Sequence, residues 1–67
     1  MEFNLKTDYI EMIKLLKVTG IAESGGMAKQ MVDDREVEYN GIVDLRKRLK
    51  VRKGDLVKVH NQEIKIV

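Results

Sequence analysis

Residues 23–41, ESGGMAKQMVDDREVEYNG, decide the fold because they change from a helical to an alternating pattern within one stretch. Ser24 is the expected N-cap of the helix, since its hydroxyl can accept a hydrogen bond from a free backbone N–H two or three residues on. Apolar and acidic residues then alternate over residues 36–39, which predicts a strand. Asn40-Gly41 is the strongest short-range hairpin signal that a sequence carries. The stretch therefore predicts a helix that leads directly into a hairpin, with residues 42–43 as the second strand.

The start of this helix is also suited to an anion. Gly25 and Gly26 leave the first amides unobstructed, and Lys29 can project from the same end one turn later. The helix dipole, bare amides and an ammonium group can together bind a phosphate. The glycines match neither the Walker A nor the G-x-G-x-x-G pattern, so we do not expect a nucleotide site. Alone the pattern favours an ordinary helix cap; together with the basic residues nearer the C-terminus it favours phosphate contact.

The chain before residue 23 predicts a strand and a first helix. Residues 2–6 alternate, with Phe3 and Leu5 on one face. We expect the helix to open at Thr7 or Asp8, with Asp8 as N-cap and Glu11 completing a variant of the capping box. Glycine at position 20 is the expected end of this helix.

Both helices show apolar residues at helical spacing, which predicts one buried face on each. The second helix is expected to end near residues 33–35, where two acids oppose the helix dipole. The predicted buried residues are Ile10, Met12, Ile13, Leu15 and Leu16 in the first helix, and Met27, Ala28, Met31 and Val32 in the second.

Residues 45–54, LRKRLKVRKG, form the most basic segment of the chain. The six basic residues among these ten are Arg46, Lys47, Arg48, Lys50, Arg52 and Lys53. Leu45, Leu49 and Val51 are spaced to hold the segment against the protein body, with the cations outward. The pattern beyond it predicts a turn at residues 54–55, a strand at 56–60, a tight turn at Asn61-Gln62 and a last strand at 63–67 with Ile64 and Ile66 inward.

The charge of the chain is unevenly distributed. The net charge is +2, but residues 1–44 hold five Lys/Arg against nine Asp/Glu, or −4, and residues 45–67 hold eight against two, or +6. Such a patch usually meets nucleic acid or an anionic membrane surface, although a charge run can also be a solvated face. If six cations met phosphates on a single strand, binding would fall with salt at a log–log slope of about −0.7 × 6, or roughly −4.

Composition excludes several classes of protein. We expect one domain over residues 1–67, too small for a large active-site cleft. With no cysteine there is neither a disulfide framework nor a thiolate metal site, and no apolar run approaches the roughly 20 residues of a bilayer crossing. The polar N-terminus lacks the apolar region of a signal peptide, so we expect a cytoplasmic protein without a membrane partner.

No residue pattern indicates catalysis, a cofactor or a metal. His60 is the only histidine and has no cluster of ligand-type residues near it in the sequence, and Asp33-Asp34 lacks the spacing of a metal loop. No serine has a base and an orienting acid marked by the sequence. Tyr9 and Tyr39 could each stack on an unpaired base, but aromatics are only 4% of the chain, which argues against stacking as the main mode of binding.

The order and spacing of several short motifs resemble the S4 RNA-binding domain family. They are LLK at 15–17, Gly20, Ser24, AK at 28–29, Val37, NG at 40–41, Arg46, Lys50 and GD at 54–55. The form ESGGxAK is similar to the stand-alone bacterial members of the YaaA/YbcJ type. The resemblance covers about residues 9–60.

The resemblance implies an α+β, S4-like (alpha-L) fold, with two main helices packed on a small, predominantly antiparallel sheet and a positive surface facing structured RNA. Two positions depart from the family. Many members have Arg-Leu-Asp where this chain has Glu11-Met12-Ile13, so Lys14 or Lys17 would replace that arginine, and Arg35 stands where a glycine often ends the second helix. The expected RNA-binding residues are Lys14, Lys17, Ser24, Gly25, Gly26, Lys29, Arg35, Asn40, Arg46, Lys47, Arg48, Lys50, Arg52 and Lys53.

Residue chemistry and resemblance together predict a non-enzymatic protein that binds structured, ribosomal RNA through its phosphate backbone and acts in ribosome assembly or maintenance. We expect a monomer with no small-molecule substrate. The alternative from another class is a protein-interaction adaptor that uses the basic segment and the acidic hairpin.

Overall fold

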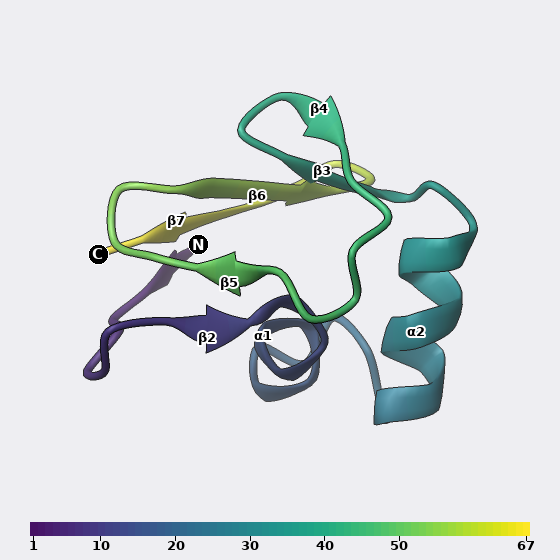
Figure 1. The fold of residues 1–67 in the computed structure, drawn as a ribbon, viewed down its shortest axis with the longest axis horizontal. Coiled ribbons are helices and arrows are strands. Elements are labelled where there is room, and N and C mark those ends of the chain that lie inside the picture. Colours follow the sequence, from purple (N-terminus) through teal and green to yellow (C-terminus); the bar gives the residue numbers. More distant parts are fainter.

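The computed structural model describes all residues 1–67 and confirms the predicted α+β fold class. The elements are β1 (Glu2–Phe3), β2 (Ile10–Glu11), α1 (Met12–Val18), α2 (Gly25–Asp33), β3 (Val37–Tyr39), β4 (Ile42–Val43), β5 (Lys50–Val51), β6 (Leu56–Val59) and β7 (Gln62–Ile66). Helix α1 lies across one face of a sheet, α2 packs against α1 beyond the end of the sheet, and a small two-stranded ribbon lies on the same side as α1 (Figure 1).

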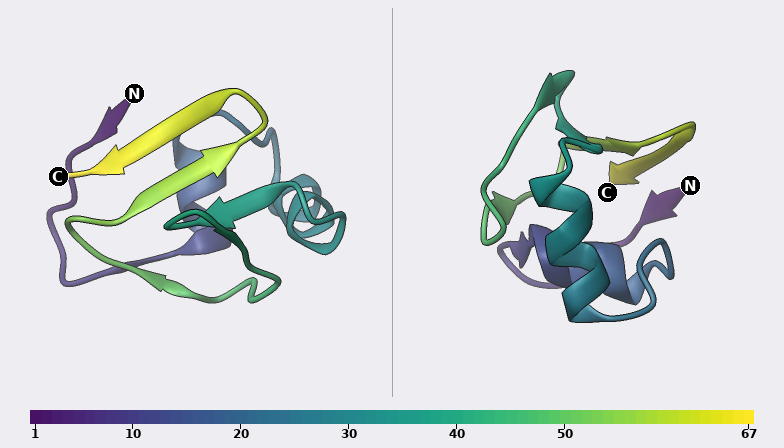
Figure 2. Two further views of the ribbon diagram at one scale, coloured as in Figure 1. Left: turned by 90° about the horizontal axis from the view of Figure 1, so that it is seen from above. Right: turned by 90° about the vertical axis from the view of Figure 1, so that its right-hand side faces the viewer.

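The main sheet has the strand order β1-β7-β6-β3-β4. Only β1 and β7 run parallel, so the sheet is predominantly antiparallel, as predicted. This parallel pair brings the two ends of the chain to the same side of the molecule, while β4 rises away from both helices (Figure 2). The ribbon consists of β2 and β5, in which Ile10 is opposite Val51.

The first helix begins later than predicted. Residues 10–11 are extended and pair with residues 50–51, and the helix starts at Met12 with Glu11 as a cap residue that makes no side-chain cap bond. Amide hydrogens of Met12 and Ile13 donate to the carbonyls of Leu49 (2.9 Å) and Lys47 (3.2 Å). The predicted start at residues 7–8 and the predicted capping box were wrong, because pairing with a distant segment satisfies these amides instead of a local cap.

Both helices end in a residue with positive φ. Gly20 (φ 81°) ends α1, and its N–H donates to the carbonyl of Lys17 at 3.1 Å. After α2 the same place is taken by Arg35 (φ 62°), whose N–H donates to Val32 at 3.2 Å. The next N–H, of Glu36, donates to Met31 at 3.1 Å, which completes a Schellman motif. Arg35 therefore adopts a left-handed conformation that favours glycine, at a backbone cost of about 1 kcal/mol.

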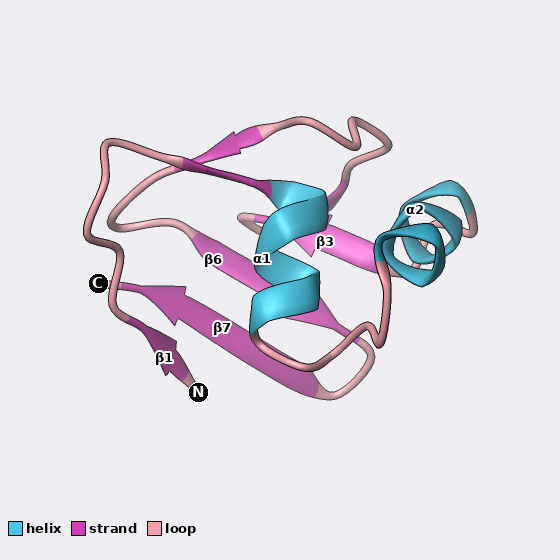
Figure 3. Cartoon of the chain, turned by 90° about the horizontal axis from the view of Figure 1, so that it is seen from below, coloured by secondary structure: helices cyan, strands magenta, loops and turns pink.

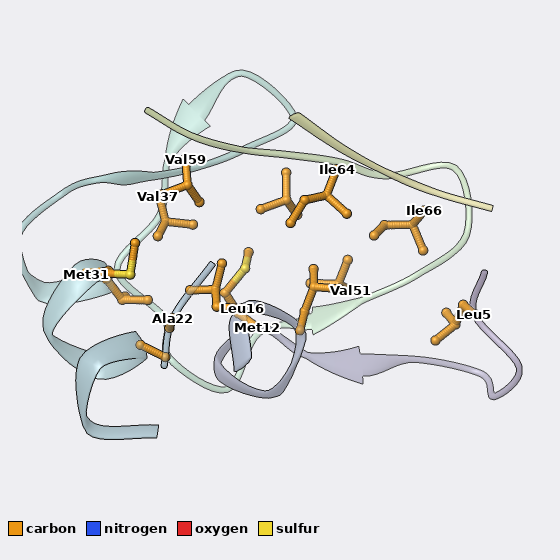
Figure 4. Close-up of a cluster of buried hydrophobic side chains, with 14 residues drawn as sticks. Leu5, Met12, Leu16, Ala22, Met31, Val37, Val51, Val59, Ile64 and Ile66 are labelled. Carbon is orange, nitrogen blue, oxygen red and sulfur yellow. The ribbon is translucent and has the colours of Figure 1, made fainter. Parts of the chain in front are cut away.

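The core lies between the sheet and the helices (Figure 4). Helix α1 lies across the face of β6 and β7, and α2 lies beside β3 (Figure 3). Two predicted core residues are instead exposed: Met27 by 43% and Leu45 by 48%. Leu45 follows the protruding strand β4, so it has no neighbouring layer to cover it. The buried residues are Leu5, Met12, Leu15, Leu16, Ala22, Ala28, Met31, Val32, Val37, Val51, Val57, Val59, Ile64 and Ile66.

One of the two hairpin turns of the main sheet lies where it was predicted, and the other does not. Asn40 (φ 51°) and Gly41 (φ 90°) form the predicted turn, with Tyr39 opposite Ile42. The C-terminal turn, by contrast, is at residues 60–61, one residue earlier than predicted, so His60 is in the turn rather than in a strand. This register puts Val57 opposite Ile64, and both side chains point into the core.

Neither helix of the chain has the length and apolar content needed to span a membrane.

Candidate nucleic-acid interface

The basic segment, residues 45–54, runs from the end of the β3–β4 hairpin through β5 to the start of β6 (Figure 1). It is held to the protein body by Val51, which is fully buried, and by Leu49, which packs against the core. Strand β5 pairs with β2, so the middle of the segment also has fixed backbone hydrogen-bond partners. The cations of this segment are therefore displayed from a supported backbone.

The first three cations of the segment, residues 46–48, each pair with an acid, and we call them the paired half. Arg46 lies 2.8 Å from Asp44. The other two pairs are longer-range in sequence: Lys47 lies 2.8 Å from Asp33 at the end of α2, and Arg48 lies 4.0 Å from Glu11 in β2. The positive charge of this half is largely compensated in place.

Of these three acids, Asp44 accepts the most hydrogen bonds from its partner. Its carboxylate accepts hydrogen bonds from the Arg46 Nε (3.0 Å), Nη2 (2.8 Å) and backbone N–H (2.9 Å). The guanidinium hydrogen bonds lower the pKa of Asp44 below its ordinary value, and they raise the pKa of Arg46 in return. This carboxylate therefore positions the start of the basic segment.

The last three cations, Lys50, Arg52 and Lys53, form no ion pair, and we call them the open half. Lys50 Nζ lies 4.9 Å from the centre of the Tyr9 ring, and the Arg52 guanidinium carbon lies 5.7 Å from it. An aromatic face attracts a cation without neutralising its charge. The uncompensated positive charge of the segment is thus gathered in residues 50–53, and two of its three cations contact one tyrosine.

Asp55 holds the open half against the hairpin. Its carboxylate accepts hydrogen bonds from the Tyr39 hydroxyl (2.6 Å), the Arg52 backbone N–H (2.8 Å) and the Asn40 amide (3.3 Å). Burial alone would raise the pKa of Asp55, but these hydrogen bonds outweigh it, and the pKa lies below the ordinary value. The same Tyr39–Asp55 bond, together with burial, raises the pKa of Tyr39.

The start of α2 has the predicted cap. The Ser24 hydroxyl accepts a hydrogen bond from the Met27 N–H at 3.1 Å, and the amides of Gly25 and Gly26 have no backbone or side-chain acceptor. The basic segment, however, contacts the other end of this helix through Asp33. At 1.5 Å per residue, Gly25 lies about 12 Å along the axis from that contact. The amides and the basic segment therefore do not converge on one phosphate.

Comparison with known proteins identifies the family. A model of the S4 domain matches residues 3–67. This chain belongs to the S4 domain family. It is 34% identical over 62 residues to YbcJ of Escherichia coli strain K12, a match that covers 92% of this chain and 89% of YbcJ. It is also 34% identical over 56 residues to the probable ribosome maturation protein RlbA of Bacillus subtilis, covering 84% and 79% of the two chains.

A solved structure agrees with this assignment. The solution structure of E. coli YbcJ, described as revealing an αL motif involved in RNA binding, superposes on this S4 domain with a TM-score of 0.75. The two are 34% identical, and the match covers 98% of this chain and 85% of YbcJ. The alpha-L fold expected from the sequence is therefore confirmed.

The predicted site residues of this S4 domain do not all lie together. Lys14 lines a hollow that also includes Tyr9, whereas Lys17 is in the last turn of α1. Asn40 is largely structural, because its side-chain oxygen accepts the Leu56 N–H at 2.8 Å while its amide donates to Asp55. Arg35 holds the end of α2, and Lys29 is exposed on that helix.

Sequence reasoning missed the carboxylates that organise the basic segment. No acid was singled out as part of the site, yet Asp33, Asp44, Asp55 and Glu11 hold its cations or its backbone. Two of these contacts are local, since Asp44 lies two residues before Arg46 and Asp55 lies three residues after Arg52. The ion pairs of Asp33 and Glu11, and the bond from Tyr39 to Asp55, join residues from separate elements, which a single sequence does not show.

Proposed function

We propose that this S4 domain, residues 1–67, binds structured RNA through the phosphate backbone, without catalysing a reaction. The observation that carries the proposal is the open half: three cations without an ion pair at and after strand β5, two of which, Lys50 and Arg52, lie against the exposed Tyr9 ring. The description of YbcJ as holding an RNA-binding αL motif supports it. Backbone recognition suits A-form RNA, because its deep, narrow major groove is poorly readable by side chains.

The ion pairs reduce the number of cations that are free to meet phosphates. If only the open half engages, the log–log slope of binding against salt is about −0.7 × 3, or roughly −2; if the paired half exchanges its acids for phosphates, the slope approaches −4. Exposed ion pairs are weak, typically about 0.2–1 kcal/mol, so this exchange is energetically accessible. The measured slope therefore reports how much of the segment is used.

We further propose that the RNA is ribosomal and that the protein acts as a monomer in the cytoplasm, in ribosome assembly or maintenance. The name of its Bacillus subtilis relative, a probable ribosome maturation protein, supports this choice. The domain is small and its basic segment is on one side, which suits docking onto a folded RNA surface.

Binding to ribosomal RNA fragments and ribosomal particles across a salt series tests the proposal. The test variant is Lys50→Gln/Arg52→Gln, and the matched control is Lys58→Gln/Lys65→Gln, which removes the same charge from β6 and β7. We expect salt-sensitive binding that the test variant weakens and the control retains, with circular dichroism confirming that both fold. The proposal is overturned if the wild type shows no salt-sensitive binding to any of these RNAs.

One feature favours the alternative function, a protein-interaction adaptor. The edge strand β4 exposes Ile42 by 73% and Val43 by 44%, next to the exposed Leu45. An apolar sheet edge of this kind can pair with a strand of another protein. Changing Arg46, Lys47 and Arg48 to glutamate separates the two functions: a protein partner that stays bound, with no RNA binding in the wild type, favours the adaptor.

A further inference from the structure

We propose that Tyr9 is a stacking platform for one unpaired base of the bound RNA, with Lys50 and Arg52 holding the phosphate of that nucleotide. The inference rests on the proposed RNA-binding function and adds to it a ligand of defined chemistry, a nucleotide whose base is outside a duplex.

The β2–β5 ribbon places the three side chains on one face. Ile10 is opposite Val51 in the antiparallel register, so the next pair outward is Tyr9 and Arg52. Side chains alternate along a strand, and Val51 is fully buried, so the neighbouring Lys50 and Arg52 point to solvent. As a result, Lys50 Nζ lies 4.9 Å and the Arg52 guanidinium carbon 5.7 Å from the centre of the Tyr9 ring.

Tyr39, the other tyrosine of the chain, has the contacts that are typical of a structural role. Tyr39 packs against the core, and its hydroxyl donates to Asp55. Tyr9 is outside the core cluster and 40% exposed, and its hydroxyl makes no hydrogen bond. The ring of Tyr9 therefore has a free polar tip and solvent-facing surface.

Space for a nucleotide lies beside the ring. An open hollow of about 770 Å³ is lined by residues 3–11 and by Lys14. Its wall includes the polar side chains of Asn4, Lys6 and Asp8, which can bond the edge of a base or a sugar hydroxyl. The hollow thus joins the aromatic ring to a further cation, Lys14, on α1.

The chemistry of these groups selects a nucleotide over a simple anion. Lys50 lies over the ring through an exposed cation–π contact, and Arg52 adds to its own contact one long hydrogen bond from Nη1 to the Asp8 carbonyl (3.5 Å). Exposed contacts of this kind are weak and readily exchanged. A phosphate can draw both cations from the ring, and a base can then stack on the face that they leave. Bases within a duplex do not offer their faces, so the ligand is a nucleotide in a bulge, loop or overhang.

Two RNA hairpins with the same stem test the proposal, one blunt and one with a two-nucleotide 3′ overhang. Both stems are closed by a non-nucleotide linker, so that the overhang is the only source of unpaired bases. Wild type, Tyr9→Phe and Tyr9→Leu are titrated with both at one salt concentration. We expect Tyr9→Leu to lose roughly 5- to 100-fold in affinity for the overhang hairpin while its affinity for the blunt hairpin is unchanged. Tyr9→Phe keeps the ring and should bind both hairpins like the wild type.

Fluorescence provides a second measurement that does not depend on the leucine variant folding. The chain has two tyrosines and no tryptophan, so in Tyr39→Phe the only emitter is Tyr9. Stacking predicts that the overhang hairpin quenches this emission at saturation and that the blunt hairpin does so much less.

The outcomes separate the two proposals. Equal binding of both hairpins by wild type and Tyr9→Leu, or equal quenching by both hairpins, overturns the stacking site and leaves the RNA-binding function standing. Absence of salt-sensitive binding to either hairpin and to the ribosomal RNAs overturns both.

Discussion

The two halves of the basic segment carry the same number of cations, yet the structure treats them differently. Each cation at positions 46–48 has a carboxylate partner, and these partners come from the β4 end, α2 and β2. The cations at positions 50, 52 and 53 have none, and Lys50 and Arg52 contact the Tyr9 ring instead. A run of basic residues is therefore not a uniform positive surface, because neighbouring acids decide which charges remain for a ligand.

Each half also has its own aspartate anchor. Asp44 binds the side chain and backbone of Arg46, within the same stretch of chain. Asp55 joins the Arg52 backbone to Tyr39 and Asn40 of the hairpin. The paired half is thus held by its charges, whereas the open half is held by its backbone and its charges remain free.

The largest expected effect comes from removing the charges of one half at a time. Changing residues 50, 52 and 53 to glutamine should reduce the salt slope of RNA binding by about 2 and the affinity at 0.1 M salt by roughly 100-fold. The same change at residues 46–48 should cost much less, because those cations must first leave their acids. Anisotropy titrations over a salt series measure both, and equal losses would contradict the division into halves.

Removing Asp44 or Asp55 should show that the two anchors contribute unequally to the free energy of unfolding. Asp55→Ala leaves the Tyr39 hydroxyl and the Arg52 N–H without their acceptor, so we expect the free energy of unfolding to fall by about 2–3 kcal/mol. Asp44→Ala breaks an ion pair whose Arg46 side chain is 68% exposed, and it should cost about 1 kcal/mol or less. Urea unfolding at neutral pH provides the comparison, and Asp55→Asn serves as a control that keeps an acceptor oxygen. A larger loss in the Asp44 variant would reverse the assigned roles.

Acid should weaken both anchors. The pKa values of Asp44 and Asp55 are lower in the folded protein than in the unfolded chain, where an aspartate titrates at about 3.9. Their contribution to stability is therefore present above about pH 4 and is lost as the pH falls through the folded values. Unfolding midpoints measured from pH 6 down to pH 2 should fall in the wild type and fall less in Asp55→Asn. A variant that follows the wild-type curve throughout would show that Asp55 is not a source of the acid sensitivity.

The smallest expected effect comes from a substitution that turns one paired cation, Lys47, into a free one. Asp33→Asn removes the acid that lies 2.8 Å from Lys47. We expect the salt slope to steepen by up to about 0.7 and RNA affinity at 0.1 M salt to rise by up to roughly 5-fold. Asp34→Asn, one residue later on the same helix end, is the matched control, because Asp34 bonds Gln30 and no cation. An equal gain in both variants would mean that net charge, rather than the ion pair, controls binding.

Features that depend on neighbouring residues were predictable. Ser24 caps α2, and Asn40-Gly41 forms the hairpin turn, as the sequence indicated. Both depend on hydrogen bonds or backbone angles within a few residues, so the local sequence contains the information. The family resemblance extended the prediction from these local features to the whole fold, including the place of the basic segment. The assignment of individual RNA-binding residues remains a prediction.

The sequence by itself determined α2, the β3–β4 hairpin and the density of positive charge, because each follows from residues close together in the chain. Only the tertiary structure decided where α1 begins and which cations are free. Ile10 meets Val51 across the ribbon, Glu11 meets Arg48 and Asp33 meets Lys47, and each pair joins separate elements. Pairing energy of this kind exists only after the chain has closed these loops, so no local pattern of residues reports it.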